Sequence, residues 1–302
     1  MNTNTIIQLD HVSKHFGTKT VLSDIHFTME NAGIYALLGR NGSGKTTLMN
    51  LLTCRYFPTD GTIKIFHQEP FDNENVLPKI CFMSDHLVGF QDISIRKILN
   101  FAKTFYPTWS DTFMQQCLTT FHLDPKAIYQ KLSKGMQSAV SITIALSART
   151  PLTLLDEIHT GLDASVRQDF YKLLLDDYLQ YPRTYLISTH LIDEMEPLFS
   201  HVLLLNDQKL FLNMELEAIK ERSFECVGTK EMLSFLSDKN ILATEQFLSS
   251  TKAIIFDTLS QEEKRTLKRL GVNIRSLSLQ EIFIALTKET SNPVNPMEAH
   301  PN

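Results

Sequence analysis

Hydrophobic and polar residues recur with two alternating periods along residues 1–213. Short apolar runs of strand length are followed by stretches in which apolar residues return every three or four positions, as on one face of a helix. The pattern predicts strands at 6–12, 21–29, 34–38, 62–66, 79–83, 152–155 and 184–188, and helices after Gly42, at 94–107, 110–121, 133–148, 164–179 and 191–198. We expect Asp60-Gly61 to form a hairpin turn, and a further hairpin at 201–212. Repeated strand-then-helix units indicate an α/β protein with a doubly wound parallel sheet.

Residues 214–291 show a different order of predicted strands and helices. Strands are predicted at 224–228, 241–248, 252–257 and 272–277, and helices at 230–238, 261–270 and 280–287, the last capped by Ser278. This βαββαβ order is typical of a small split-βαβ module. We therefore expect a large domain at 1–213, a small α+β accessory or regulatory domain at 214–291, and a disordered, proline-containing tail at 292–302.

The composition of the chain excludes several classes of protein. The 302 residues carry 29 basic and 34 acidic side chains, a net charge of −5, so nucleic acid is not expected as a partner. The longest apolar runs fall far short of the ~20 residues that cross a bilayer, and residues 1–5 lack the pattern of a secretion signal. The four cysteines are scattered without zinc-site spacing, which favours reduced, mostly buried thiols.

A glycine-rich segment follows the continuous apolar run at 34–38. It fits G-x-x-x-x-G-K-[ST], the pattern of a phosphate-binding loop between a strand and a helix. Glycines allow tight turns and leave backbone N–H groups free to point at phosphate oxygens, and the helix start adds its positive dipole. The Lys45 side chain would reach the β- and γ-phosphates, and the Thr46 hydroxyl would ligate Mg²⁺. The segment comprises Gly39, Arg40, Asn41, Gly42, Ser43, Gly44, Lys45, Thr46 and Thr47.

Two acids end the apolar strand at 152–155. At the carboxyl end of a strand in an open α/β sheet, Asp156 could hold Mg²⁺ and Glu157 could take a proton from an attacking water. The alternative is a pair of solvated acids that open a loop. His190 follows the strand at 184–188 and could donate a hydrogen bond to a γ-phosphate oxygen, or could be a packed or capping residue.

Together these motifs resemble the ATP-binding subunit of ABC transporters over residues 6–212. The segment Leu132-Ser133-Lys134-Gly135-Met136-Gln137 is similar to the family signature, although by itself it could be only a capped helix. The resemblance implies a P-loop NTPase of the ABC type with an antiparallel β subdomain and a helical subdomain. It also implies that Ser133 and Gly135 cover ATP held by a second subunit, that Asp163 belongs to the D-loop, that His190 is the switch histidine and that Phe16 stacks on adenine. Phe16 could instead be a core or turn aromatic.

Several positions depart from the family pattern. Lys134 and Met136 replace a glycine and the glutamine of the common signature, and this version resembles those of bacterial export-type systems. Asp85 stands where a glutamine is usual; it can still coordinate Mg²⁺, but it adds a negative charge beside the γ-phosphate. Ile158-His159 replaces the usual Pro-Thr or Pro-Ser after the catalytic glutamate, and His159 could be a surface loop residue or lie near the subunit contact.

The resemblance implies the following activity. ATP with Mg²⁺ would join two copies of the chain head to tail, and hydrolysis would separate them and drive transport through separate membrane permease subunits. We expect the chain to be cytoplasmic, peripheral on the inner face of the membrane, docking through residues 85–92 and the next helix, and to serve export. The alternatives are a soluble ABC-type ATPase acting elsewhere and a nucleotide-sensing regulator without turnover, which Asp85 favours.

Overall fold

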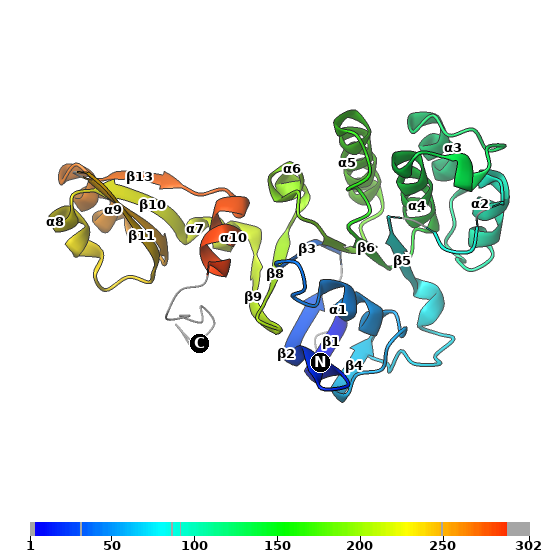
Figure 1. The fold of residues 1–302 in the computed structure, drawn as a ribbon, viewed down its shortest axis with the longest axis horizontal. Helices are drawn as coiled ribbons and strands as arrows, with labels where there is room; N and C mark the ends of the chain where they lie inside the picture. Colours follow the sequence, from blue (N-terminus) through cyan, green and yellow to red (C-terminus); the bar gives the residue numbers. More distant parts are fainter. Residues whose placement is uncertain (1–3, 31, 86, 91, 249, 289–302) are drawn as a thin grey trace.

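A computed structural model describes residues 4–30, 32–85, 87–90, 92–248 and 250–288. The expected disordered tail at 292–302 lies outside these residues. The described residues form three sheets; in Figure 1 the amino-terminal sheet lies below the central one and the carboxyl-terminal sheet lies at the left. Among the described helices, none combines the length and apolar composition that crossing a membrane requires.

The central sheet carries the strands that the continuous apolar runs predict. Its order is β5-β6-β7-β3-β8-β9, parallel except for the edge strand β9, which returns antiparallel to β8. All five residues of β3 are buried, as expected for a strand covered on both faces. The bounds are β3 Ile34–Leu38, β5 Ile80–Ser84, β6 Leu152–Asp156, β7 Thr184–Ser188, β8 His201–Asn206 and β9 Lys209–Glu215.

Helices cover both faces of this sheet. In Figure 1, α1 lies below the central strands, whereas α4, α5 and α6 lie above them, so the doubly wound prediction is confirmed. Two helices begin at the serine caps that the sequence predicts: the hydroxyl of Ser110 caps α3 and that of Ser133 caps α4. Ser94 precedes α2 without a side-chain cap hydrogen bond. The bounds are α1 Lys45–Leu52, α2 Ile95–Lys103, α3 Asp111–Thr120, α4 Lys134–Ala148, α5 Ala164–Gln180 and α6 Ile192–Met195, with 3₁₀ turns η1 Leu77–Lys79, η2 Tyr129–Lys131 and η3 Glu196–Leu198.

The amino-terminal sheet corrects one prediction. Its strands β1 Thr5–Phe16, β2 Lys19–Glu30 and β4 Asp60–Ile65 pair antiparallel in the order β2-β1-β4. Asp60-Gly61 is not a hairpin turn, because both residues belong to β4, where Asp60 pairs with Ser13 of β1. A Cβ on Gly61 would come within 2.3 Å of the carbonyl oxygen of His11, so the glycine serves a close backbone approach within the sheet.

The carboxyl-terminal sheet has the predicted element order. The strands are β10 Ser223–Gly228, β11 Ile241–Phe247, β12 Ser250–Phe256 and β13 Asn273–Ser276, in the order β11-β12-β10-β13. Between them lie α8 Lys230–Leu233 with η4 Ser234–Leu236, and α9 Gln261–Arg269. The sequence analysis did not predict α7 Leu216–Glu221, which joins this sheet to β9.

The last helix packs into the core of the central sheet. α10 Leu279–Thr287 follows the sheet β10–β13, which has its own apolar cluster, yet Leu279, Ile282 and Leu286 pack into the large cluster of the central sheet. The backbone N–H of Leu279 donates to the Glu196 carboxylate at 2.9 Å, beside α6. The carboxyl-terminal segment is therefore fastened to the face of the molecule that carries α6.

A buried ion cluster is centred on Asp177. The Asp177 carboxylate in α5, whose side chain is 1% exposed, accepts from Arg149 at 2.6 Å and from Arg183. Replacing one partner of a buried pair leaves an uncompensated charge, so we expect Asp177→Asn to lower the free energy of unfolding by about 3 kcal/mol in urea denaturation. The neighbouring exposed Asp176 is the matched control, and Asp176→Asn should change stability by less than about 0.5 kcal/mol. Equal effects of the two changes would contradict the assignment.

Candidate functional site

The carboxyl ends of β3, β6 and β7 meet at one edge of the central sheet. There the Asp156 carboxylate at the end of β6 accepts a hydrogen bond from the Thr46 hydroxyl at 2.8 Å and another from the Ser188 hydroxyl at 2.5 Å. Parallel register produces this meeting, since Asp156 pairs with Ser188 along β6 and β7. The structure thus joins Thr46 directly to Asp156, both of which the sequence analysis selected, and adds a second donor that it missed, Ser188.

The loop 39–47 is shaped as a backbone cradle. Gly39, Gly42 and Gly44 have φ angles of +157°, +82° and +104°. A Cβ on Gly39 would come within 2.3 Å of the Ser43 hydroxyl, and one on Gly44 would come within 2.5 Å of the Leu22 side chain, so both positions need glycine. Among the described residues, the buried Ser43 hydroxyl has no hydrogen-bond partner. An unpaired polar atom of this kind fits a loop that awaits an anionic ligand.

Lys45 lies inside this cradle, with 8% of its surface exposed. Its ammonium donates to the carbonyl oxygens of Gly39 at 2.8 Å and Arg40 at 3.4 Å. Burial lowers the pKa of Lys45, while the negative charges of Glu157 and Asp156 oppose that change. A bound phosphate would compensate the buried ammonium directly.

Glu157 and His190 lie beside Asp156. The imidazole Nδ1 of His190 is 3.5 Å from the Glu157 carboxylate, and both side chains are partly exposed. Glu157 has a φ of +50°, a conformation that is costly for a residue with a Cβ. Its backbone N–H donates to the hydroxyl and the carbonyl of Ser188, which maintains this conformation. The catalytic pair expected from the sequence is therefore brought together at the edge that carries the loop.

This donor set fits a nucleotide with its metal. The cradle offers N–H groups, a buried ammonium and an unpaired hydroxyl for phosphate oxygens, and the oxygens of Thr46 and Asp156 are of the kind that Mg²⁺ prefers. Gly39, Arg40 and Asn41 also line a pocket of 400 Å³ with Thr189, His190 and Phe283, so the loop opens to solvent on that side.

Comparison with known proteins decides the family. The family described as ABC transporter matches residues 22–160, which include the loop 39–47, Ser133, Gly135, Asp156 and Glu157. The chain carries an ABC transporter ATP-binding domain. Because such domains hydrolyse ATP, the chain is an ABC-type ATPase.

Three curated relatives illustrate the range of the family. The chain is 29% identical to the ABC transporter ATP-binding protein YtrB of Bacillus subtilis (strain 168), over 93% of this chain and 97% of YtrB. It is 27% identical to the bacitracin transport ATP-binding protein BcrA of Bacillus licheniformis, over 78% and 77%. It is 32% identical to the Fe(3+) ions import ATP-binding protein FbpC 2 of Pectobacterium atrosepticum, over 61% and 56%.

Solved structures show the same fold. The structure of an ATP-binding subunit of an ABC transporter superposes with a TM-score of 0.65 at 22% identity, over 72% of this chain and 92% of that one. The dimeric ATP-binding cassette MJ0796, solved in a post-hydrolysis state with ADP and Pi, superposes with a TM-score of 0.59 at 21% identity, over 70% and 99%. The P-loop NTPase fold of the ABC type is thus confirmed.

Ser133 and Gly135, the expected signature residues, lie at the start of α4, and Gly135 faces Gly161 in the expected D-loop segment. The Ser133 hydroxyl accepts from the N–H of Met136 at 3.2 Å and caps the helix. A Cβ on Gly135 would come within 2.8 Å of the Gly161 carbonyl, so the glycine permits this contact. Asp163 caps α5 by accepting from Val166 at 3.0 Å.

Two expected site residues lie in less enclosed places. Asp85 is exposed and directly follows β5 at the same sheet edge, where Ser84 pairs with Asp156, and the Ser138 hydroxyl donates to its backbone carbonyl at 3.1 Å. Phe16 ends β1, is 44% exposed and contacts Tyr56 edge-on, with ring centroids 5.2 Å apart. The Lys14 ammonium lies 5.0 Å from the centroid of the Phe16 ring, and stacking of this ring on adenine stays a prediction.

His159 is not a surface loop residue, which corrects one of the two alternatives left open above. Its side chain is fully buried, Nε2 lies 2.8 Å from the Thr189 hydroxyl, and the ring stacks near Phe170. The Thr189 hydroxyl also accepts from the N–H of Leu191 at 2.9 Å, so the pair links the segment after Glu157 to the segment that carries His190. The sequence analysis missed Thr189; its position after a buried strand at the site edge is the signal that could have found it.

Burial makes His159 a source of pH-dependent stability. Desolvation lowers the pKa of His159 to about 4 from 6.5, so the unfolded chain binds more protons between these values. Stability from this residue is therefore present above pH 6.5 and is lost as pH falls toward 4; linkage gives a loss of about 2 kcal/mol between pH 7 and pH 5.

We expect His159→Gln, which removes the titrating ring and retains a hydrogen-bonding group, to lose less stability than the parent on that change of pH. The measurement is urea unfolding at both pH values. His122→Asn, at an exposed histidine, serves as the control that should behave like the parent. An unchanged pH dependence in His159→Gln would show that His159 does not titrate as described.

Proposed function

We propose that the chain is the ATP-hydrolysing subunit of a transporter whose membrane-spanning part is a separate protein. The observation that carries this proposal is the Asp156 carboxylate held between Thr46 and Ser188, with Glu157 and His190 beside it. This arrangement places metal-binding oxygens and a candidate proton acceptor at the mouth of the phosphate loop.

Each residue of the site then has a role. The N–H groups of residues 39–47 and the Lys45 ammonium bind the phosphates, and Thr46 and Asp156, with Asp85 on the next strand, would hold Mg²⁺, which neutralises phosphate charge. Glu157 accepts a proton from the water that attacks the γ-phosphorus, and the bond to the bridging oxygen breaks. His190, in contact with Glu157, donates to the γ-phosphate. Phe16 stacks on the adenine.

We propose that two copies associate head to tail around ATP. In each chain the amino terminus of α4, with Ser133 and Gly135, forms a second anion site, and Figure 1 shows that α4 and α1 lie on opposite faces of the central sheet. The Gly135–Gly161 contact links this site to the D-loop that leads to Asp163. The dimeric solved relative MJ0796 supports this form of assembly.

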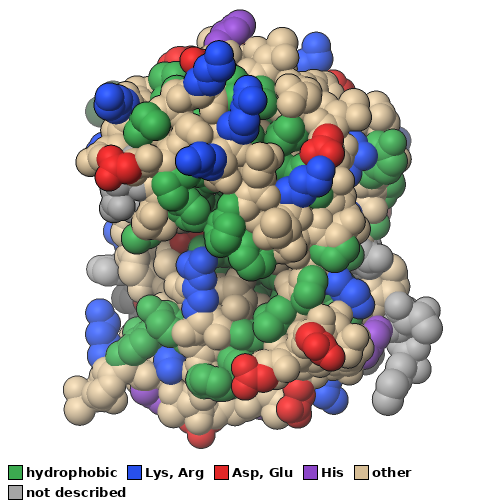
Figure 2. All heavy atoms as spheres, turned by 90° about the vertical axis from the view of Figure 1, so that its right-hand side faces the viewer, with side chains coloured by type: hydrophobic (Ala, Val, Ile, Leu, Met, Phe, Trp, Pro, Cys, Tyr) green, Lys and Arg blue, Asp and Glu red, His purple; other side chains and the backbone are tan. Residues whose placement is uncertain are grey.

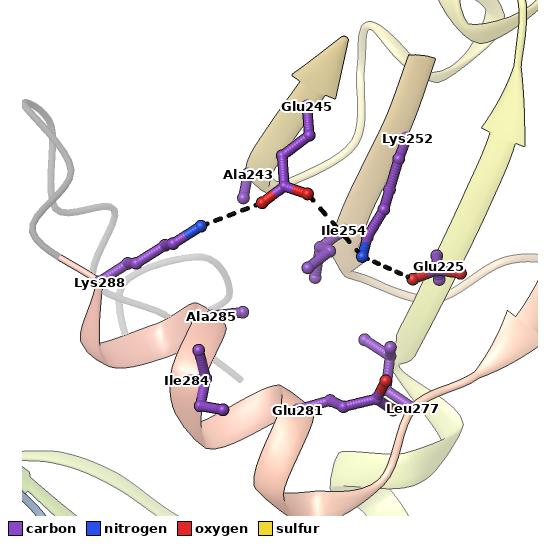
Figure 3. Close-up of a pocket in the computed structure, with 10 residues that line it drawn as sticks. All are labelled: Glu225, Ala243, Glu245, Lys252, Ile254, Leu277, Glu281, Ile284, Ala285 and Lys288. Carbon is purple, nitrogen blue, oxygen red and sulfur yellow. Dashed lines mark hydrogen bonds and ion pairs between the residues drawn. The ribbon is translucent and has the colours of Figure 1, made fainter. Parts of the chain in front are cut away.

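We also propose that residues 214–291 form an accessory domain that regulates the site. Its helix α10 contributes Phe283 to the pocket that contains Arg40 and His190. Figure 3 shows how α10 is held to its sheet: the Glu245 carboxylate in β11 lies between Lys288 of α10, at 3.1 Å, and Lys252 of β12, at 3.9 Å, above a cavity of 140 Å³. A shift of this sheet would therefore move Phe283 relative to the nucleotide.

The membrane partner is proposed to dock on the face that carries α2. Figure 2 shows apolar side chains gathered among basic ones on this side of the molecule. Val88, Phe101 and Phe105 are 79%, 52% and 55% exposed, and the last two rings contact each other edge-on. His86 and Gln91 of the expected docking segment 85–92 lie outside the described residues. We propose that the chain lies on the cytoplasmic side of the membrane. We also propose that the direction of transport is export, because the signature segment 132–137 and the carboxyl-terminal extension resemble those of export-type subunits.

Replacing the proposed proton acceptor provides the central test. We expect Glu157→Gln to bind ATP with near-parent affinity, to lose at least about 100-fold in phosphate release, and to accumulate as a dimer with Mg-ATP in light scattering. Lys45→Ala is the control, which should remain monomeric because it loses nucleotide binding. A Glu157→Gln variant that stays monomeric with ATP bound would contradict the ATP-joined dimer, and undiminished turnover would contradict the role of Glu157.

Two measurements distinguish a transporter subunit from the alternative, a regulator that senses nucleotide without turnover. The charge of Asp85 is the feature that supports this alternative. The first measurement is co-purification. We expect a multispanning membrane protein to co-purify with the chain in mild detergent and to be lost with the double change Phe101→Glu and Phe105→Glu. Phe235→Glu, at a similarly exposed ring in the carboxyl-terminal domain, should retain it. Steady-state phosphate release by the intact complex distinguishes the ATPase from the regulator.

A further inference from the structure

A group of histidine and aspartate side chains lies on the exposed face of the amino-terminal sheet. One ligand atom from each of Asp10, His11 and His26 lies within 4.8 Å of the others. The three side chains are 52%, 71% and 59% exposed, so a solvated cation can reach them. None of them belongs to the nucleotide site described above.

A β-bulge creates this grouping. Leu9 pairs with Phe27 and Val12 with Ile25, so the two residues Asp10 and His11 oppose the single residue His26. Successive side chains in a regular strand point to opposite faces, yet Asp10 and His11 are both exposed, because His11 adopts a φ of +51°. Gly61 of β4 accommodates the displaced carbonyl of His11.

The distances are those of metal ligands. The Oδ1 atom of Asp10 lies 3.1 Å from Nδ1 of His26 and 3.9 Å from Nε2 of His11. Two ligands bound at 2.0–2.1 Å to a tetrahedral zinc ion lie ~3.3 Å apart, so small side-chain rotations complete the geometry. Asp24 is positioned behind the group: its carboxylate is 2.6 Å from Nδ1 of His11 and leaves Nε2 of that ring for a metal. A carboxylate on the far nitrogen of a ligating imidazole is the usual outer partner in zinc sites.

We propose that Asp10, His11 and His26 bind a divalent transition-metal ion of the zinc class, with Asp24 orienting His11. Two imidazoles and one carboxylate favour Zn²⁺, Ni²⁺ or Cu²⁺ over Mg²⁺ or Ca²⁺, which take oxygen ligands. The ion replaces the proton between His26 and Asp10 and fixes β1 to β2 at the bulge. Water completes the coordination on the solvent side.

Titration of the full chain with Zn²⁺ in a calorimeter, after treatment with a chelator and in the presence of millimolar Mg²⁺, tests this site. We expect micromolar binding that is lost in His26→Ala and weakened at least about 10-fold in Asp24→Asn, which retains the size of the side chain and tolerates its φ of +54°. His67→Asn, at an exposed histidine with a φ of +65°, should bind like the parent.

Zn²⁺ could also bind at Glu157 and His190, so His190→Ala is the second control and should retain the binding event. Loss in His190→Ala with retention in His26→Ala would overturn the proposal, as would absence of zinc binding by the parent chain. Unchanged circular dichroism and ATP binding in His26→Ala show that any loss is local.

Discussion

The candidate site depends on the Asp156 carboxylate and its two hydrogen bonds, one to the phosphate loop and one to the neighbouring strand. Thr46 and Ser188 lie far apart in the sequence, and the parallel register of β3, β6 and β7 brings their hydroxyls to a single acceptor. The same register places Glu157 over Ser188, whose hydroxyl and carbonyl hold its strained backbone. The residue that would bind the metal, the candidate base and the phosphate loop are consequently positioned by neighbouring strands of one sheet. No distant segment has to move to bring them together.

This arrangement has a free-energy cost in the chain without ligand. Lys45 is buried against the carbonyls of its own loop, the Ser43 hydroxyl is buried without a partner among the described residues, and Glu157 has a left-handed φ. Each of these features opposes folding, and the first two are relieved by phosphate oxygens. Nucleotide binding should therefore stabilise the fold as well as the proposed dimer. The strained backbone of Glu157 is held by its hydrogen bonds to Ser188, which ends the fully buried strand β7.

The sequence was sufficient to predict the features that depend on local pattern. The continuous apolar run at 34–38, the caps Ser110 and Ser133, and the glycine spacing of residues 39–46 are local signals, and the structure bears out the elements they indicate. Features that depend on tertiary contact were missed or wrong. Asp60-Gly61 has a hairpin composition, but Gly61 is needed for the approach of another strand. The polar side chain of His159 gives no local signal of burial, and packing against α5 and the segment after β7 buries it.

The course of α10 shows why the carboxyl-terminal residues matter to the site. A helix that packed only on β10–β13 could move with that sheet and leave the nucleotide loop undisturbed. Instead, ion pairs fasten α10 to its sheet at both ends, through Glu281 with Arg275 and Lys288 with Glu245, while Leu279 is bonded to Glu196 beside α6. Because α6 directly follows the segment that contains His190, a displacement of α10 would reach that segment under the regulation that we propose. Under the proposed regulation, binding of a partner to the sheet and binding of nucleotide at the loop would be coupled through the position of one aromatic side chain, Phe283, which lines the pocket with Arg40 and His190.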